Sequence, residues 1–179
     1  MLLEVLYLAL PAFVANMMPV VAARFNLVPF LDRPIDAHAS LRGKPLLGRN
    51  KTWRGVVAAV VGGVAIAVVQ YVCALPLHTV TTTAFDSLAI AIGYGMFVGI
   101  LVMFGDALGS IVKRQLNIQS GAPCIPLDQV DYIVIFILGT LFVTSWSVPS
   151  SAVLIGATFF LNLGANAFAY VIGIKNTYW

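Results

Sequence analysis

The stretch GVVAAVVGGVAIAVVQYVCAL, residues 55–75, runs for 21 positions without a charged side chain. A bilayer core about 30 Å thick requires roughly 20 apolar residues per helical span, so this stretch has the length of one transmembrane helix. Four further stretches approach that length, and the five predicted spans are 2–23, 55–75, 87–106, 132–146 and 152–174. Five such stretches in 179 residues leave too little polar sequence to cover them in water. The sequence therefore predicts an all-α, polytopic integral membrane protein whose single domain covers residues 1–179.

The composition also favours a membrane location. Hydrophobic residues make up 60% of the chain and charged residues only 9%, whereas about a quarter of the residues in a soluble domain are charged. The N-terminus carries Glu4 in place of the basic region of a signal peptide, and its apolar run is longer than a signal core. We therefore expect the first span to remain in the mature protein.

The basic residues predict the orientation of the five spans. If the spans alternate in direction, every Lys and Arg falls on one side, in the connections 24–54 and 107–131 and, with Lys175, in the C-terminal tail. An excess of Lys and Arg marks the cytoplasmic side, so we expect the N-terminus outside and the C-terminus in the cytoplasm. Topology and anionic headgroups account for the net charge of +3. The sequence thus predicts contact with membrane lipids and no nucleic-acid partner.

The connection 24–54 contains several residues that break regular structure, including Pro29, Pro34, Gly43 and Pro45. Proline and glycine at this density favour an irregular or re-entrant loop over a helix. We therefore expect an irregular or re-entrant loop, and not a helix, between the first two spans.

The segment GDALGSIVKRQLNIQSGAPCIPLDQVD, residues 105–131, carries most of the unusual polar residues. Four of them and one glycine share one helical face at i, i+3, i+4, i+7 and i+8, namely Asp106, Gly109, Ser110, Lys113 and Arg114. Asp128 and Asp131 are three residues apart, so they also project together if that part of the chain is helical. Ionisable residues near membrane depth are costly and indicate function.

Three carboxylates and two cations in this segment indicate a phosphate site with a divalent metal. Mg²⁺ is usually held by one or two carboxylates together with substrate phosphates. Asp106, Asp128 and Asp131 are therefore candidate ligands for one or two Mg²⁺ ions, and Lys113 and Arg114 are candidates for the remaining phosphate oxygens. The structural alternative is that Asp106 pairs with one of the cations while the other two aspartates cap a helix.

A second candidate element is LLGRNKTWRG, residues 46–55, which lacks the GxxxxGK[ST] pattern of a nucleotide-binding P-loop. Asn50, Lys51 and Thr52 are candidates to bind a substrate phosphate at the cytoplasmic mouth. Alternatively, the basic residues of this stretch only anchor the protein on the cytoplasmic side, and Trp53 only marks the membrane interface.

The remaining polar residues within the spans have simpler interpretations. Interhelical hydrogen bonds explain Asn16, Asn162 and Asn166, and close helix packing explains the glycines at positions 93, 95, 99, 105 and 109. No HxxxH, CxxC or GxSxG arrangement is present, so zinc and serine-nucleophile mechanisms have no support.

The pattern GD..GS..KR…G…P.LDQVD resembles the signature of the CTP-dependent phosphatidate cytidylyltransferases, the CDP-diacylglycerol synthases. The matching residues are Gly105, Asp106, Gly109, Ser110, Lys113, Arg114, Gly121, Pro126, Leu127, Asp128 and Asp131. Gln129 stands where that signature usually has Arg, and bacterial members are longer and have more spans. The short five-span length and the GRNKTWRG stretch instead resemble the archaeal branch, the CDP-archaeol synthases. This resemblance covers essentially the whole chain.

The resemblance implies transfer of CMP from CTP to an isoprenoid ether lipid phosphate, a di-geranylgeranyl glycerol phosphate, with release of pyrophosphate. It implies that Asp106, Asp128 and Asp131 are catalytic and bind metal. It further implies that Lys113 and Arg114 are catalytic and that Asn50, Lys51, Thr52, Gly109 and Ser110 bind substrate. Two other functions remain open: a CTP-dependent lipid kinase of the polyprenol or phytol type, and a small ion-coupled transporter.

Overall fold

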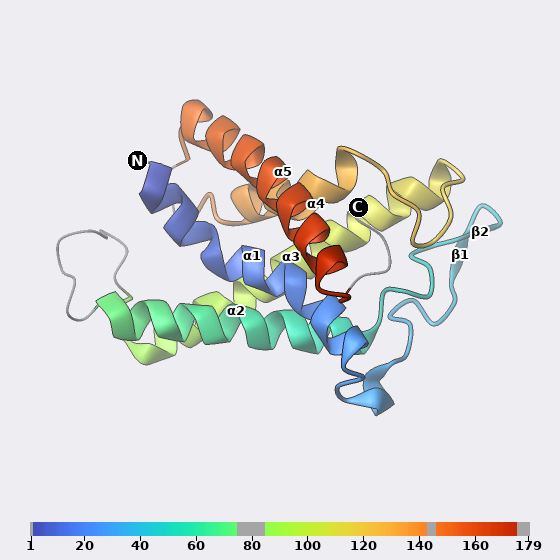
Figure 1. Cartoon of the computed structure of the whole chain (residues 1–179), viewed down its shortest axis with the longest axis horizontal. Coiled ribbons are helices and arrows are strands. Elements are labelled where there is room, and N and C mark those ends of the chain that lie inside the picture. The colour runs from blue at the N-terminus through green and yellow to red at the C-terminus, as the bar shows by residue number, and fades with distance from the viewer. Residues whose placement is uncertain (1, 75–84, 143–145, 175–179) are drawn as a thin grey trace.

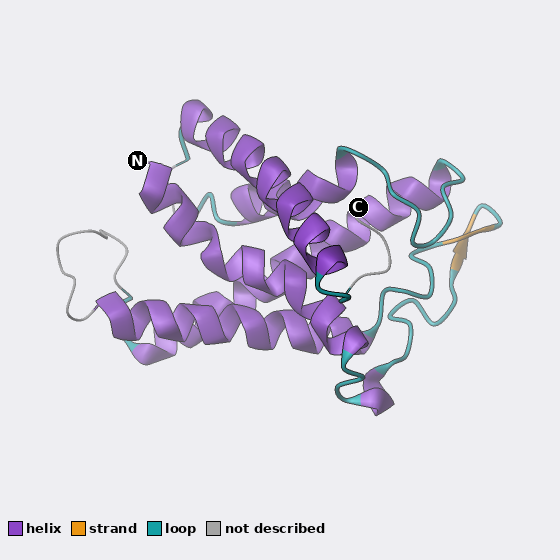
Figure 2. Ribbon diagram, viewed as in Figure 1, coloured by secondary structure: helices purple, strands orange, loops and turns teal. Residues whose placement is uncertain are grey.

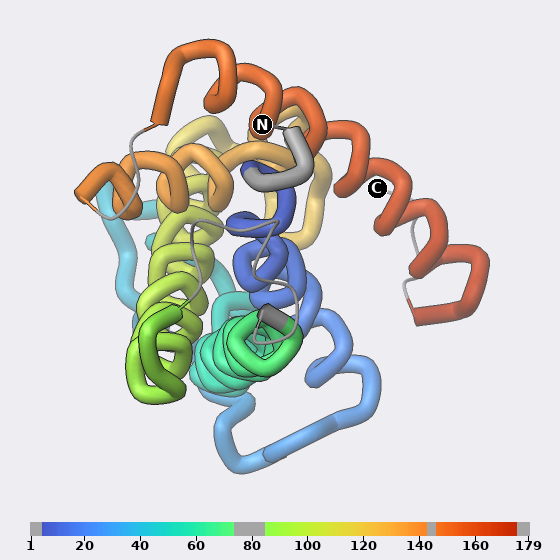
Figure 3. The backbone as a smooth tube through the Cα atoms, turned by 90° about the vertical axis from the view of Figure 1, so that its left-hand side faces the viewer, coloured from blue at the N-terminus to red at the C-terminus, as the bar shows by residue number. Residues whose placement is uncertain are grey.

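Five α-helices account for most of the residues that the computed structural model describes, which are 2–74, 85–142 and 146–174. The helices are α1 (Leu2–Arg24), α2 (Trp53–Ala74), α3 (Leu88–Gln115), α4 (Leu127–Gly139) and α5 (Val148–Val171) (Figures 1 and 2). A short 3₁₀ helix, η1 (Pro29–Leu31), and two strands, β1 (Ser40–Leu41) and β2 (Lys44–Pro45), lie between α1 and α2. The helices pack side by side as one bundle (Figure 3).

Four of the helices are long and apolar enough to cross a membrane, namely α1, α2, α3 and α5. The prediction of a helical integral membrane protein is therefore confirmed in its broad form. With 13 residues, α4 is about 20 Å long at 1.5 Å per residue, which is less than the thickness of a bilayer core. The fifth crossing stays a prediction.

The helix boundaries lie close to the predicted span boundaries for the first two spans and differ from them for the others. α3 continues nine residues past the predicted span end at 106, as the helical stripe from Asp106 to Arg114 requires. α4 begins at Leu127, five residues before the predicted span start at 132. Its first residues include the polar residues Asp128, Gln129 and Asp131, which a span chosen by hydropathy leaves out. α5 begins at Val148, where the Ser147 side chain accepts a hydrogen bond from the Ser150 backbone N–H at 3.2 Å and caps the helix.

The connection between α1 and α2 contains no α-helix, as expected, but it is not irregular throughout, since β1 and β2 form an antiparallel hairpin in which Leu41 pairs with Lys44. Arg42 and Gly43 make the two-residue turn with φ of 55° and 75°. Positive φ at both positions is typical of a type I′ turn, whose twist matches that of a hairpin. Short strands of this kind leave little pattern in the sequence, because two residues cannot show alternation.

Charge divides the two ends of the bundle. Figure 1 shows that α1 and α3 end, and that α2 and α4 begin, at the same end, which we call the basic end. All Lys and Arg of the described residues lie in the loops or helix turns there: Arg24, Arg33, Arg42, Lys44, Arg49, Lys51, Arg54, Lys113 and Arg114. Lys175 and most of the predicted external connection after α2 lie outside the described residues.

The core forms where α1, α3 and α4 meet. Val98 and Val102 of α3 and Tyr132 and Phe136 of α4 are fully buried there. The Tyr94 hydroxyl of α3 donates to the Leu8 carbonyl oxygen of α1 at 3.1 Å, so the buried phenol has its hydrogen-bond partner. This packing fixes the position of α3, which carries five of the ten predicted site residues.

Glycines bring α2 and α3 into backbone contact. A Cβ atom at Gly95 would lie 2.5 Å from the Val64 Cα, and one at Gly99 would lie 2.6 Å from the Val60 Cα. Small residues at such crossings permit the close approach that stabilises membrane helices. The predicted packing role is confirmed for these two glycines, whereas Gly93 faces open space.

We expect Gly95→Leu to destabilise the protein by about 3 kcal/mol, because the new side chain has no room against the α2 backbone. The midpoint of SDS-induced unfolding in detergent micelles measures this loss. Gly93→Leu is the matched control on the same helix, with an expected change within about 1 kcal/mol. Equal effects of the two substitutions would contradict the packing interpretation.

Candidate active site

A cavity of about 970 Å³ lies at the basic end, between the 24–52 loop, α3 and α5. Eight of the ten predicted site residues line it: Asn50, Lys51, Thr52, Asp106, Ser110, Lys113, Arg114 and Asp128. Gly109 and Asp131 are not among the lining residues and lie beside the cavity in mutual contact. Residues that are more than 70 positions apart in the sequence therefore meet at one place.

α3 supplies the main wall of the cavity, and the predicted stripe on this helix is confirmed. Its last three turns carry Asp106, Ser110, Lys113 and Arg114 toward the cavity. Ser110, Lys113 and Arg114 are each less than a tenth exposed. Cations so far from bulk water require counter-charges, since burying an unpaired charge is costly.

The Lys51 ammonium group pairs with Asp106, so the two predicted elements are joined by an ion pair. A short antiparallel bridge holds Lys51 in place, because its carbonyl oxygen accepts from the Ile35 N–H at 2.9 Å and the Trp53 N–H donates to the Arg33 carbonyl oxygen at 3.0 Å. Thr52 lies between them at the start of α2. Its hydroxyl oxygen accepts from the Gly55 N–H at 3.3 Å, which caps the helix.

A second ion pair joins α3 to α4. The Lys113 Nζ atom lies 2.9 Å from both carboxylate oxygens of Asp128. The same carboxylate accepts from the Cys124 N–H at 2.8 Å, which fixes the loop before α4. Asp128 thus serves as counter-charge and as loop anchor. The structural alternative from the sequence is wrong in its partners, because Asp106 pairs with Lys51 and Asp128, which pairs with Lys113, does not cap α4.

Asp131 packs against the Cα face of Gly109, where any larger residue would clash with its carboxylate. Its Oδ1 atom accepts from the Tyr132 N–H at 2.7 Å. Asp131 therefore lies beside the face of α3 that carries Asp106, three residues before Gly109.

A metal ion fits this donor set only with help from a ligand. Within the described ranges, no three Asp, Glu, His or Cys side chains lie close enough together to form a ready-made metal site. Asp106 and Asp128 each hold a lysine instead. Since Mg²⁺ needs only one or two carboxylates when phosphates supply its other oxygens, the aspartates fit a metal that arrives with a nucleotide.

The charges around the cavity favour a polyanion. Six cations line it (Arg24, Arg49, Lys51, Arg54, Lys113 and Arg114), against the three carboxylates Asp32, Asp106 and Asp128. The Nε atom of Arg114 is buried and has no hydrogen-bond partner among the described residues. A bound phosphate would supply that partner, because Arg binds phosphate oxygens through several N–H groups.

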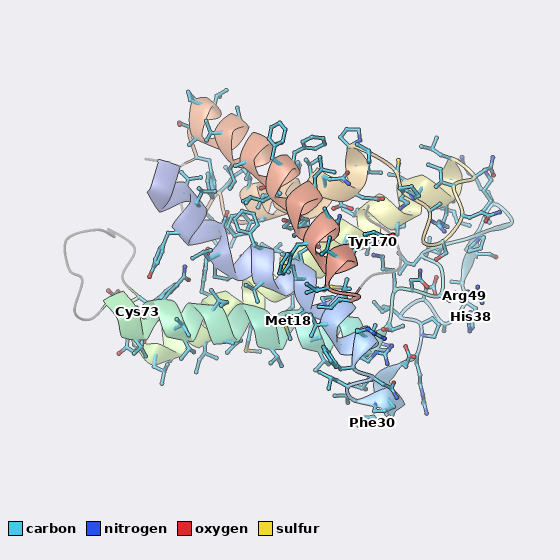
Figure 4. The ribbon with its side chains drawn as sticks, viewed as in Figure 1. Met18, Phe30, His38, Arg49, Cys73 and Tyr170 are labelled. Atoms are coloured by element: carbon cyan, nitrogen blue, oxygen red, sulfur yellow. The ribbon has the colours of Figure 1, made fainter. Side chains whose placement is uncertain are left out.

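Arg54, for which the sequence predicts only an anchoring role, is only 9% exposed and lines the cavity. Its guanidinium group donates to the Asn26 side-chain oxygen at 3.0 Å and pairs with Asp32 at 3.0 Å. Arg49, labelled in Figure 4 near the hairpin, also lines the cavity. Arg54 lies three residues after Lys51, and nothing in the local sequence indicates that both side chains line one cavity.

α1 and α5 line the cavity mainly with apolar side chains, and we call this part of its wall the apolar half. Its lining includes Met17 and Val20 from α1 and Ala165 and Phe168 from α5. Asn16 and Asn166 also line it. A cavity with a cationic half and an apolar half suits an amphiphile with an anionic head.

The interhelical hydrogen bond predicted for Asn162 is confirmed. Its Nδ2 atom donates to the Gln129 carbonyl oxygen at 2.7 Å, and its Oδ1 atom accepts from the Tyr132 hydroxyl at 3.3 Å. Asn162 thereby ties α5 to the start of α4 beside Asp128.

The whole chain, residues 1–179, matches the family described as CarS-like CDP-archaeol synthase. The CDP-archaeol synthase of Pyrococcus horikoshii is 34% identical, with 99% of this chain and 97% of the relative covered. That of Aeropyrum pernix is 35% identical, with 99% and 92% covered. A solved structure, described as an intramembrane enzyme for archaeal membrane lipids biosynthesis, superposes with a TM-score of 0.74 at 30% identity and covers 93% of this chain and 94% of that chain.

Proposed function

Because the chain belongs to the CDP-archaeol synthase family, we propose that its cavity binds CTP and a di-geranylgeranyl glycerol phosphate side by side for cytidylyl transfer. CTP-dependent cytidylyl transfer in archaeal lipid synthesis is the function of this enzyme. The resemblance seen in the signature residues is therefore confirmed. The lipid kinase and the ion-coupled transporter that the sequence left open are set aside.

The single observation that carries the proposed substrate arrangement is the division of the cavity into two halves. The cationic half, built by Lys51, Lys113 and Arg114, is placed to bind phosphates. The apolar half between α1 and α5 is placed to bind the first part of an isoprenoid chain. The scissile phosphates would then lie near Asp106, where the two halves meet.

The reaction requires stabilisation of the negative charge on the phosphate oxygens more than it requires proton transfer. An oxygen of the lipid phosphate attacks the α-phosphorus of CTP, the bond from that phosphorus to the bridging oxygen breaks, and pyrophosphate leaves. The attacking oxygen is already anionic, so no activating base is required. Lys113 and Arg114 are placed to bind the triphosphate and the departing pyrophosphate. Lys51, Asn50 and Thr52 are placed to bind the lipid phosphate.

We further propose that Asp106, Asp128 and Asp131 hold one or two Mg²⁺ ions in the complex with CTP. Mg²⁺ would supply charge neutralisation of the phosphate oxygens in the transition state. The two lysines, once they leave their carboxylates, become counter-charges for the phosphates. Ser110 faces the same cavity and is placed to donate to a phosphate oxygen, while Gly109 keeps the space that Asp131 occupies.

The proposed topology places the basic end in the cytoplasm, with α4 as a fifth crossing, the N-terminus outside and the C-terminus inside. The gathering of the basic residues at one end supports this orientation. Cytoplasmic CTP then reaches the cavity directly. Labelling of single cysteines with a membrane-impermeant maleimide in intact cells tests the orientation: Asp86→Cys should react from outside and Arg42→Cys should not.

An assay of the purified protein tests both the reaction and the lipid class. We expect labelled CTP, Mg²⁺ and an isoprenyl-ether glycerol phosphate to give CDP-lipid and one pyrophosphate per turnover. An acyl-ester phosphatidate of equal chain length is the matched comparison, with a lower expected kcat/KM. Formation of CDP and a phosphorylated lipid would instead identify a kinase and overturn the proposed arrangement.

A further inference from the structure

Residues 25–31, which we call the apolar segment, leave the end of α1 and include η1. Four of their side chains are large, apolar and exposed: Phe25 at 63%, Leu27 at 45%, Val28 at 39% and Phe30 at 70%. Nothing in the described part of the chain covers them. Exposed apolar groups in a cluster mark an interaction surface, because leaving them in water is unfavourable.

The apolar segment extends sideways from the bundle. Figure 1 shows it below the start of α2, and the view along the bundle in Figure 3 shows it reaching past α2, away from the other helices. Phe30 lies at its outer tip (Figure 4). The β1–β2 hairpin, in contrast, continues along the length of the bundle beyond the helix ends (Figure 1). The segment thus runs along the plane in which α1 ends and α2 begins.

The flanking residues are those of a membrane interface. Arg24 and Arg33 stand exposed at the two ends of the segment, and Trp53, 49% exposed, follows on the adjoining first turn of α2. Arg and Trp are enriched at the boundary between headgroups and acyl chains. The exposed side chains of Val57 and Val61 continue the apolar surface along α2, which is a candidate membrane span.

The apolar segment is firmly attached to the cavity wall. Arg54 binds both Asn26 and Asp32, one within the segment and one just after it, at 3.0 Å each. The Trp53 N–H donates to the Arg33 carbonyl oxygen at 3.0 Å. Arg54 and Asp32 also line the large cavity. The position of the segment is therefore linked to that of the cavity.

From this placement we infer that the apolar segment inserts into the boundary between headgroups and acyl chains on the basic side of the bilayer. Its partner is the lipid surface itself. The exposed aromatic rings enter the apolar layer, while Arg24 and Arg33 meet the anionic headgroups. The segment anchors the cavity mouth at headgroup level, where the phosphate of a membrane-embedded lipid lies.

Collision accessibility of a nitroxide label tests this inference in reconstituted vesicles that contain anionic lipid. The label is attached to Phe30→Cys in a background of Cys73→Ala and Cys124→Ser. Leu41→Cys is the matched control, since Leu41 is an exposed apolar residue on the hairpin. We expect the label at 30 to collide several-fold less with a water-soluble nickel chelate than the label at 41, and more with oxygen. This arm does not depend on the enzymatic activity.

Two results would overturn the inference. Equal accessibility of the two labels to the nickel chelate would place the apolar segment in water. A label at 30 that is protected from both reagents, and whose spectrum is broadened by the label of another molecule, would instead place a second copy of the chain there.

A kinetic arm rests on the proposed function. The double variant Phe25→Ser with Phe30→Ser should raise KM several-fold for a lipid phosphate embedded in vesicles, with unchanged kcat for a short-chain lipid phosphate dispersed in detergent. Leu41→Ser should change neither value. If the label at 30 shows the expected accessibilities but the protein turns over neither substrate, the proposed function is rejected and the membrane contact is retained. An unchanged KM for the embedded lipid would reject the anchoring role.

Discussion

Asp106→Asn should lower the rate of CDP-lipid formation by at least about 100-fold while the protein stays folded. Asparagine has nearly the same shape, so the change removes the charge and little else. Lys51 then loses its counter-charge, and a metal held with the nucleotide loses a carboxylate. kcat and KM for CTP measure the loss, and Mn²⁺ electron paramagnetic resonance measures metal binding in the presence of CTP.

Asp86→Asn is the matched control, because Asp86 is an exposed aspartate just before α3, at the opposite end of this helix. The double variant Asp106→Asn with Lys51→Met separates two roles of Asp106 through metal binding, since Lys51 is itself placed to bind substrate. If Asp106 serves only as the partner of Lys51, the double variant binds Mn²⁺ in the presence of CTP as tightly as the Lys51→Met single variant. If Asp106 also binds metal, Mn²⁺ binding is weaker in the double variant than in Lys51→Met. Asp128→Asn and Asp131→Asn should be equally damaging, and retained activity in both would reject the metal assignment.

Gly109→Ala should lower kcat/KM by about 100-fold through a single added methyl group. That methyl group would occupy the space of the Asp131 carboxylate, which must shift away from Asp106 or turn out of the site. A displacement of about 1 Å at a catalytic group is enough for a loss of this size. The expected change in stability is small, because alanine favours the helix by up to about 1 kcal/mol relative to glycine.

Gly93→Ala is the matched control for this prediction, since the same change on the same helix meets open space. Its activity should equal that of the unchanged protein. Normal activity of Gly109→Ala would mean that the position of Asp131 does not matter for the reaction, and Asp131 would then have only a structural role.

Helical spacing is the part of the site that the sequence could predict. Asp106, Ser110, Lys113 and Arg114 share one face of α3 because the helix repeats every 3.6 residues, whatever its neighbours do. The same reasoning brings Asp128 and Asp131 to the start of α4. Hydropathy, in contrast, does not give the end of α3 or the start of α4, because it measures preference for lipid and these are polar turns that line the cavity or pack beside it.

Contacts between distant segments could not be predicted. Lys51 and Asp106 are 55 residues apart, and their ion pair depends on the glycine contacts that bring α2 against α3. Arg54 looked like an ordinary basic anchor, since its burial comes from Asp32 and Asn26 in a loop whose path the sequence does not state. No local pattern distinguishes a buried arginine from an exposed one at the same helix start.

In the site without ligand, the two lysines occupy the carboxylates that a metal ion would bind, and the two carboxylates occupy the lysines that a phosphate would bind. A divalent cation alone can bind Asp106 or Asp128 only if a lysine loses its counter-charge. A triphosphate alone can bind a lysine only if a carboxylate loses its counter-charge. Only a ligand that brings both charges satisfies all four groups. We therefore expect Mg²⁺ and CTP each to raise the affinity for the other by the same factor. The site would then bind free metal ions and free nucleotide weakly and bind the metal–nucleotide complex tightly.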